Sequence, residues 1–227
     1  TDDRTHVKYP LTDYELTPQV AIVDPEFVMT VPKRTVALSG LDTLSHALEA
    51  YVSVMASDLT RPWSLEAIKL VIENLEDSYN YDPKHPTLRG EQARENMHYA
   101  ATLAGMAFSN AFLGINHSIA HKTGGEFGLP PGLAISIAMQ HVIRYNGVAG
   151  NVKRSVFPRY EEYRAQRDYA DIARSLDLKG KDDAALVEAL CERIDALMKA
   201  VDVDPRLSAK GVTKEAFDAA VDKLASL

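Results

Sequence analysis

Two short segments of this chain place histidines and a carboxylate at helical spacing. His117 and His121 are four residues apart, and so are Asp42 and His46. Residues at this spacing lie on one face of an α-helix, about one turn from each other. The two pairs offer one hard oxygen and up to three nitrogens, which suits a divalent first-row metal better than calcium or magnesium. We therefore predict that Asp42, His46 and His117 converge on one point in the fold.

Each pair also has an ordinary structural explanation. Asp42, two residues after Gly40, would suit the first turn of a helix, where an acid interacts favourably with the helix dipole without any metal. Paired histidines also occur as hydrogen-bonded core residues. The metalloprotease motif does not apply, because it needs Glu directly after the first His, and Ser118 stands there. The other histidines are interpreted as structural or solvated: His6, His85, His98 and His141.

The elements that position the two pairs are predicted to be helices. From Pro32 onward the apolar residues recur with a helical period, as in the stripe Leu41, Leu44, Leu48, Tyr51, Val52 and Met55. A second helix is predicted to be capped by Thr60 and to end at a loop over residues 79–90. Later helices are expected at residues 91–113, around the two histidines, and at 132–145, 165–176, 183–201 and 213–226, the last capped by Thr213.

The residues before Pro32 have a different pattern. Val7–Leu11 and Val20–Asp24 are short runs of β-type residues on either side of a link that contains Pro and Asp. Two strands alone are only marginally stable. These runs are therefore expected to belong to a sheet whose other strands are outside this chain.

The composition is that of an ordinary globular protein and excludes several classes of function. Of 227 residues, 46% are hydrophobic and 25% are charged, and the net charge is −7. An acidic chain without clustered Lys and Arg argues against a nucleic-acid partner. The single cysteine, Cys191, cannot form an internal disulfide, and no stretch approaches the roughly 20 apolar residues that span a bilayer. We expect a cytoplasmic protein without a membrane partner, and a chain that begins inside a longer one.

The glycines and prolines around the histidines carry a more specific signal. From Gly114 the order is Gly, two residues, His, two residues, Ala-His, two residues, Gly, five residues and Pro, with Gly132 at the end. This order resembles the signature of the iron-containing (group III) alcohol dehydrogenases, in which His stands where this chain has Pro131. Residues 8–18, 40–51 and 104–114 are similar, more closely, to the C-terminal alcohol dehydrogenase part of the bifunctional aldehyde-alcohol dehydrogenases. The resemblance covers nearly the whole chain.

The resemblance implies a fold and a set of site residues. The fold would be mainly α, the helical metal-binding domain of a dehydroquinate synthase-like enzyme. Residues 1–33 would be residual strands and a link from the missing nucleotide-binding domain, and residues 34–227 the all-α metal-binding and catalytic domain. The resemblance assigns Asp42, His46 and His117 as metal ligands, His121 to the proton path near nicotinamide and substrate, and Lys8, Phe108 and Leu113 to the cofactor side.

Pro131 departs from this pattern, because a proline side chain offers no lone pair to a metal. Three protein ligands can still hold a catalytic ion, and Glu126 or His121 are the residues that would take the fourth place. The loss of a ligand should weaken metal affinity.

The activity that the resemblance implies is the interconversion of a short primary alcohol and its aldehyde, ethanol and acetaldehyde, with NAD and with Fe²⁺, or Zn²⁺ as the alternative ion. Because no Gly-rich phosphate loop follows a strand here, the chain alone is expected to bind a dinucleotide poorly and to be inactive without the N-terminal domain. The family also implies homo-oligomers, including filaments. Two alternatives stay open: a structural or assembly domain with a degenerate metal site, favoured by Pro131, and a metal-dependent hydrolase in a helical bundle.

Overall fold

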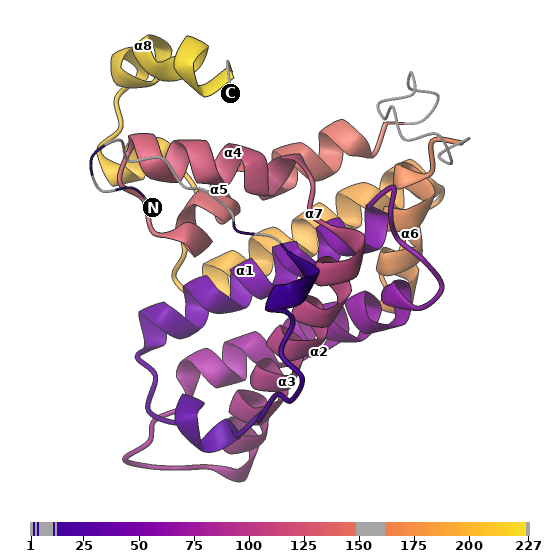
Figure 1. The fold of residues 1–227 in the computed structure, drawn as a ribbon, viewed down its shortest axis with the longest axis vertical. Helices are drawn as coiled ribbons and strands as arrows, with labels where there is room; N and C mark the ends of the chain where they lie inside the picture. The colour runs from indigo at the N-terminus through magenta and orange to yellow at the C-terminus, as the bar shows by residue number, and fades with distance from the viewer. Residues whose placement is uncertain (1, 3, 5–10, 12, 149–161, 226–227) are drawn as a thin grey trace.

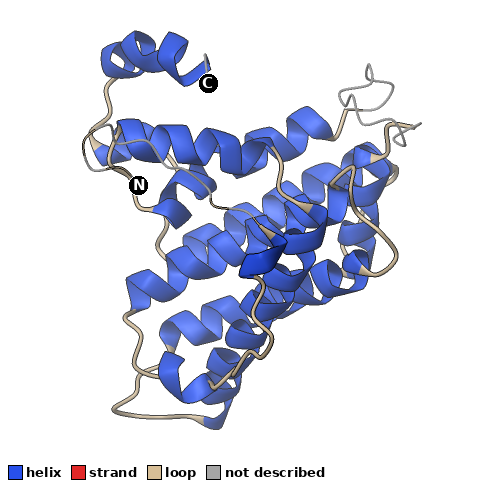
Figure 2. Cartoon of the chain, in the orientation of Figure 1, coloured by secondary structure: helices blue, strands red, loops and turns tan. Residues whose placement is uncertain are grey.

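The structure is a computed structural model that describes residues 2, 4, 11, 13–148 and 162–225. Within these residues the regular structure is entirely helical and no strand occurs (Figures 1 and 2). The α-helices are α1 (Lys33–Val52), α2 (Thr60–Asn80), α3 (Leu88–Ala111), α4 (Ile115–Glu126), α5 (Pro131–Asn146), α6 (Ala165–Ser175), α7 (Asp183–Ala200) and α8 (Lys214–Ala225). Short 3₁₀ helices span Tyr14–Leu16, Pro25–Val28 and Leu207–Lys210. The predicted mainly α fold is confirmed.

Helix α1 lies at the centre of the bundle. It contacts α2, α3, α5 and α6, and it crosses the middle of the view in Figure 1. It begins directly after Pro32, and between Val36 and Tyr51 most of its residues are buried. A helix surrounded on all sides needs apolar residues on nearly every face. The ionisable residues that α1 carries into this setting, Asp42, His46 and Glu49, therefore need partners from neighbouring helices.

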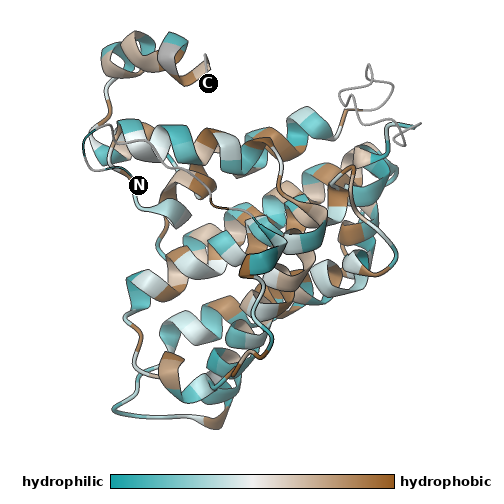
Figure 3. Ribbon diagram, viewed as in Figure 1, coloured by the Kyte–Doolittle hydropathy of each residue, from teal (hydrophilic) through white to brown (hydrophobic). Residues whose placement is uncertain are grey.

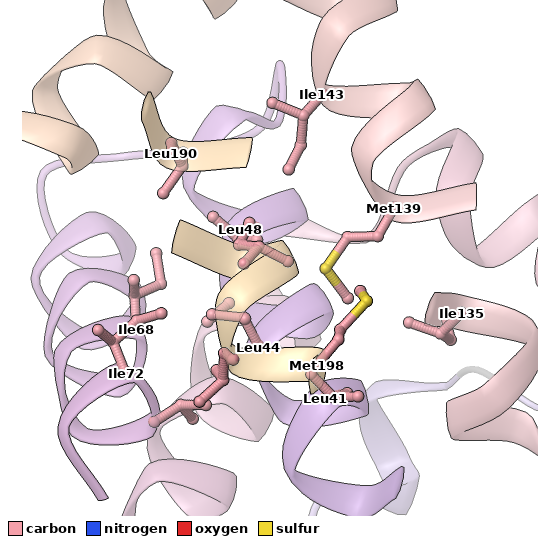
Figure 4. Packing of buried hydrophobic residues seen from close by; sticks show 14 of the residues in the cluster. Leu41, Leu44, Leu48, Ile68, Ile72, Ile135, Met139, Ile143, Leu190 and Met198 are labelled. Atoms are coloured by element: carbon pink, nitrogen blue, oxygen red, sulfur yellow. The ribbon is translucent and has the colours of Figure 1, made fainter. Parts of the chain in front are cut away.

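The core joins α1 to three other helices. The side chains drawn in Figure 4 include Leu41, Leu44 and Leu48 of α1, Ile68 and Ile72 of α2, Ile135, Met139 and Ile143 of α5, and Leu190 and Met198 of α7. Full burial of each such side chain contributes about 1.5–3 kcal/mol. In Figure 3 most helices carry both apolar and hydrophilic residues along their length, as expected for helices that pack with one face. This packing fixes α5 against α1.

The first turn of α5 makes an unusually close approach to α1. A Cβ atom at Gly132 would lie 2.1 Å from the carbonyl oxygen of Leu38, so only glycine allows this contact. Pro131, at the first position of α5, suits a helix start because its missing N–H has no partner there in any case. The contact holds position 131 close to the α1 backbone.

The structure corrects several local predictions. Val20–Asp24 is not a strand: no partner strand lies in the described part of the chain, and Val20 and Ile22 are 77% and 89% exposed. Asp24 instead caps the 3₁₀ helix Pro25–Val28. The other predicted strand, Val7–Leu11, falls outside the described residues apart from Leu11.

Most helix boundaries were predicted closely, but one of the two predicted caps and the start of the third helix were wrong. Thr60 does not cap α2, because its hydroxyl accepts a hydrogen bond from the backbone N–H of Ser57, on the side away from the helix. Helix α3 begins before residue 91, and Thr87 caps it through the N–H of Gly90. Thr213 does cap α8, through the N–H of Ala216 at 3.2 Å.

Candidate metal centre

Asp42 and His46 of α1 meet His117 of α4, as predicted. One ligand atom from each residue lies within 4.8 Å of the others. The imidazole rings of His46 and His117 stack with centroids 4.4 Å apart and an interplanar angle of 24°. Asp42 is not at a helix start, because α1 begins at Lys33, so the first-turn explanation of this carboxylate is wrong. Asp42 lies in the middle of α1, and its carboxylate is close to the imidazoles of His46 and His117.

The face that α4 turns toward the protein is polar and small. Its buried residues are Asn116, His117, Ala120, Thr123 and Gly124. Ile115 and Ile119, by contrast, are 40% and 37% exposed in this chain. A helix that buries polar groups must satisfy them by specific contacts. The position of α4 therefore depends more on polar contacts of its buried side chains than on apolar burial.

The donor atoms fit a divalent transition metal. The Nε2 atom of His117 is buried and has no hydrogen-bond partner, and at 3.6 Å it is too far from Asp42 Oδ1 for a hydrogen bond. A cavity of about 90 Å³ lies beside it, lined by Asp42, His46, His117, Ala120, His121, Pro131 and Ile135. One carboxylate oxygen and two imidazole nitrogens around a small cavity are ligands that iron and zinc accept. A cation there would satisfy the buried nitrogen.

The charges around the cavity also favour a cation. Burial lowers the pKa of His46 to about 4, so its ring is neutral near pH 7 and keeps a lone pair. Burial opposes a charge on His117, but its contacts with the carboxylates of Asp42 and Glu49 outweigh this and raise its pKa to about 9. Burial likewise acts to raise the pKa of Asp42, yet the interaction with His117 leaves that pKa lowered. Without an ion, the His117 ring is therefore protonated near pH 7, because the carboxylates of Asp42 and Glu49 attract positive charge.

Glu49 is the residue of this site that the sequence-based reasoning missed. Its side chain is buried, and its carboxylate contacts Nδ1 of His117. A signal was present, because Asp42, His46 and Glu49 follow the spacing i, i+4 and i+7 on one face of α1, and Glu49 stands alone in an apolar run.

Pro131 lies where the resemblance expected a fourth ligand, because it lines the same small cavity as the three predicted ligands. His121 also lines it, with its ring edge-on to His117 at a centroid distance of 6.1 Å, but it is not one of the three clustered donors. Glu126, the other suggested substitute, is the exposed last residue of α4 and does not line the cavity.

A larger cleft of about 900 Å³ adjoins the cluster. Phe108, Leu113, His117 and His121 line it, together with residues from the segment 11–18. The ring of Phe108 also stacks on His46, with centroids 4.5 Å apart. Two of the three predicted cofactor-side residues therefore border one cleft with His121, whereas Lys8 lies outside the described residues.

The remaining described histidines do not join this cluster. His85 is exposed and pairs with Asp82 at 2.9 Å, His141 is exposed and His98 half-buried. Among the described helices, none combines the length and the apolar character that crossing a bilayer requires.

The chain is similar in sequence to known proteins. Aldehyde-alcohol dehydrogenase 2 of Entamoeba histolytica is 46% identical over 227 residues, which is 100% of this chain and 25% of that protein. The bifunctional aldehyde-alcohol dehydrogenase of Escherichia coli is 45% identical over 99% of this chain and 25% of its own length. The chain thus spans about a quarter of the length of these curated relatives.

A solved structure and a family model point the same way. The iron-containing alcohol dehydrogenase of Thermococcus thioreducens superposes with a TM-score of 0.77 at 32% identity, over 94% of this chain and 49% of that one. The model of the Fe-containing alcohol dehydrogenase family, C-terminal, matches residues 36–226. The chain therefore belongs to the Fe-containing alcohol dehydrogenases and corresponds to the C-terminal, helical part of that family.

Proposed function

We propose that this chain is the metal-binding domain of an enzyme that interconverts a short primary alcohol, such as ethanol, and its aldehyde with NAD. The observation that carries the proposal is the convergence of Asp42, His46 and His117, within 4.8 Å of one another, beside a cleft that His117 and His121 also line. Two names among the relatives, both aldehyde-alcohol dehydrogenases, support the substrate class.

Asp42, His46 and His117 would hold the ion, Fe²⁺ by family or Zn²⁺ as the alternative. When bound, such an ion supplies Lewis-acid stabilisation of negative charge on the substrate oxygen. NAD would supply the hydride acceptor. The protein's own contribution is orientation, because His46 is held between the rings of His117 and Phe108, with centroids 4.4 and 4.5 Å away.

His121 would exchange a proton with a substrate hydroxyl. It lines both the small cavity and the larger cleft. A general acid or base must lie within hydrogen-bond reach of the reacting group in a plausible pose. A substrate oxygen in the small cavity would satisfy that condition. Phe108 and Leu113, on the wall of the larger cleft, would exclude water from the cofactor side.

The rest of the enzyme would come from sequence that precedes this chain. We infer that residues 1–33 link the helical domain, residues 34–227, to a nucleotide-binding domain, in a larger cytoplasmic bifunctional aldehyde-alcohol dehydrogenase that assembles into homo-oligomers or filaments. The coverage of about a quarter of each relative supports this arrangement. The isolated chain should be inactive.

The test uses the full-length protein that contains this chain. After metal stripping and reloading with Fe²⁺ or Zn²⁺, it should reduce NAD⁺ with ethanol and oxidise NADH with acetaldehyde, both followed by the absorbance of NADH. His117→Ala should abolish the alcohol reactions, and His85→Ala, at an exposed histidine, should not change them. If the reloaded protein has neither reaction, the proposal is wrong.

A further inference from the structure

Glu49 makes contacts that connect two helices at one point. Its Oε1 accepts a hydrogen bond from the backbone N–H of Asn116 at 2.9 Å and a longer one from that of His117 at 3.4 Å. Its Oε2 contacts the ring Nδ1 of His117 and accepts from the hydroxyl of Ser45 at 3.5 Å. The side chain is buried. One carboxylate from α1 thus caps the start of α4 and holds an imidazole on it.

The start of α4 is built to receive this carboxylate. Its N-cap residue is Gly114, which has no side chain to cap the helix. A Cβ atom at Gly114 would lie 2.8 Å from Glu49 Oε1, closer than ordinary contacts. The free N–H groups of a first turn need acceptors when they are buried. Glu49 provides the acceptor that a Ser or Asp at the N-cap provides in other helices.

The contact with Nδ1 determines which ring nitrogen faces the cavity. A carboxylate only accepts hydrogen bonds, so Nδ1 carries the proton that it shares with Oε2. In the neutral ring, the form in which a histidine binds a metal, the lone pair is then on Nε2, which is buried without a hydrogen-bond partner and lies 3.6 Å from Asp42 Oδ1. A carboxylate that fixes ring orientation and tautomer in this way supports the affinity of a metal-binding histidine.

We propose that Glu49 is a positioning residue of the metal site, which holds His117 with Nε2 directed at the ion while it caps α4. This inference rests on the proposed metal-binding function. It adds a residue that acts through His117 and does not touch the ion or the substrate.

Glutamine at position 49 is a sharp test because it keeps the size of the side chain and removes one acceptor. If its carbonyl oxygen caps Asn116 N–H, its NH₂ group faces Nδ1 and drives the ring proton onto Nε2. If it turns over, the cap is lost. Glu49→Gln can therefore either cap α4 or accept the Nδ1 proton of His117, but it cannot do both.

The experiment measures Zn²⁺ affinity by calorimetry in the metal-stripped full-length protein. We expect Glu49→Gln to bind Zn²⁺ about 10- to 100-fold more weakly than the wild type. With saturating Co²⁺, its visible absorption should differ from that of the wild type because His117 no longer coordinates in the same way. Gly114→Ala, which keeps the carboxylate but displaces it, should weaken Zn²⁺ binding in the same direction and to a smaller extent. This variant also serves if Glu49→Gln fails to fold.

Thr87→Ala is the matched control, because it removes the cap of α3 and leaves the metal site alone. It should lower the melting temperature and leave Zn²⁺ affinity unchanged. If Glu49→Gln and Gly114→Ala also melt earlier but bind Zn²⁺ as the wild type does, Glu49 only caps a helix and the proposal is wrong. A wild type that binds no Zn²⁺ would instead refute the metal site itself.

Discussion

Helices α4 and α7 bury opposite kinds of residue. Helix α7 contacts α2, α5 and α6. It buries Leu186, Val187, Leu190, Cys191, Ile194, Leu197 and Met198. Helix α4 buries Asn116, His117 and Thr123 and leaves two isoleucines partly exposed. Apolar burial stabilises α7, but it is non-directional and does not set the position of any particular atom. Helix α4 is instead held by a few directional hydrogen bonds. A change in α7 should therefore cost stability, and a change in the inner face of α4 should cost metal binding.

The largest effect is expected in α7. Ile194 is fully buried, and Ile194→Ala should lower the free energy of unfolding by about 2–5 kcal/mol through lost contacts and a cavity. Chemical denaturation of the variant and the wild type measures this, with Glu192→Ala on the exposed face of α7 as the control. Metal affinity of the folded variant should stay the same. A weaker metal site in the folded variant would remove the distinction between the two helices.

On the inner face of α4, His117→Ala should weaken Zn²⁺ binding by more than about 100-fold, or about 2.7 kcal/mol, because it removes a ligand. Calorimetric titration of the metal-stripped full-length protein provides the measurement. His85→Ala should titrate like the wild type, since His85 is exposed and pairs with Asp82. Equal affinity in His117→Ala would show that α4 does not bind the ion.

Pro131→His should tighten metal binding by about tenfold, or about 1.4 kcal/mol, because it adds an imidazole to the small cavity. In the absence of metal the same change should cost about 0.4–1 kcal/mol, because proline restricts the unfolded chain. Calorimetry and thermal melts with and without Zn²⁺ separate the two effects. Unchanged affinity would mean that the backbone at 131 does not direct a side chain at the ion.

The smallest effect is expected on the outer face of α4. Ile119→Ala should change the free energy of unfolding by no more than about 1 kcal/mol, because Ile119 is 37% exposed and loses less burial than Ile194. The two Ile→Ala variants form a matched pair in one denaturation experiment. If Ile119→Ala lowered the free energy of unfolding as much as Ile194→Ala does, the isoleucines of α4 would not lie on its outer face.

Sequence periodicity predicted α7 closely because its buried residues repeat at helical spacing, and residues 183–201 contain the observed helix. It also placed Asp42 with His46 on one face of α1. The strand at Val20–Asp24 was wrong because β propensity needs a partner strand to take effect. Glu49 was missed because its role depends on α4, whose Asn116 is 67 positions away in the chain. Spacing within one helix does not reveal a partner on another.

The two cavities beside the cluster have a kinetic consequence. His117 and His121 line both the cavity of about 90 Å³ and the cleft of about 900 Å³. An ion in the smaller space would therefore lie next to the cleft. A molecule bound in the cleft would cover the side of the ion that faces the cleft and slow its escape in that direction. If Asp42, His46 and His117 hold the ion, its residence time should therefore lengthen while the cleft is occupied.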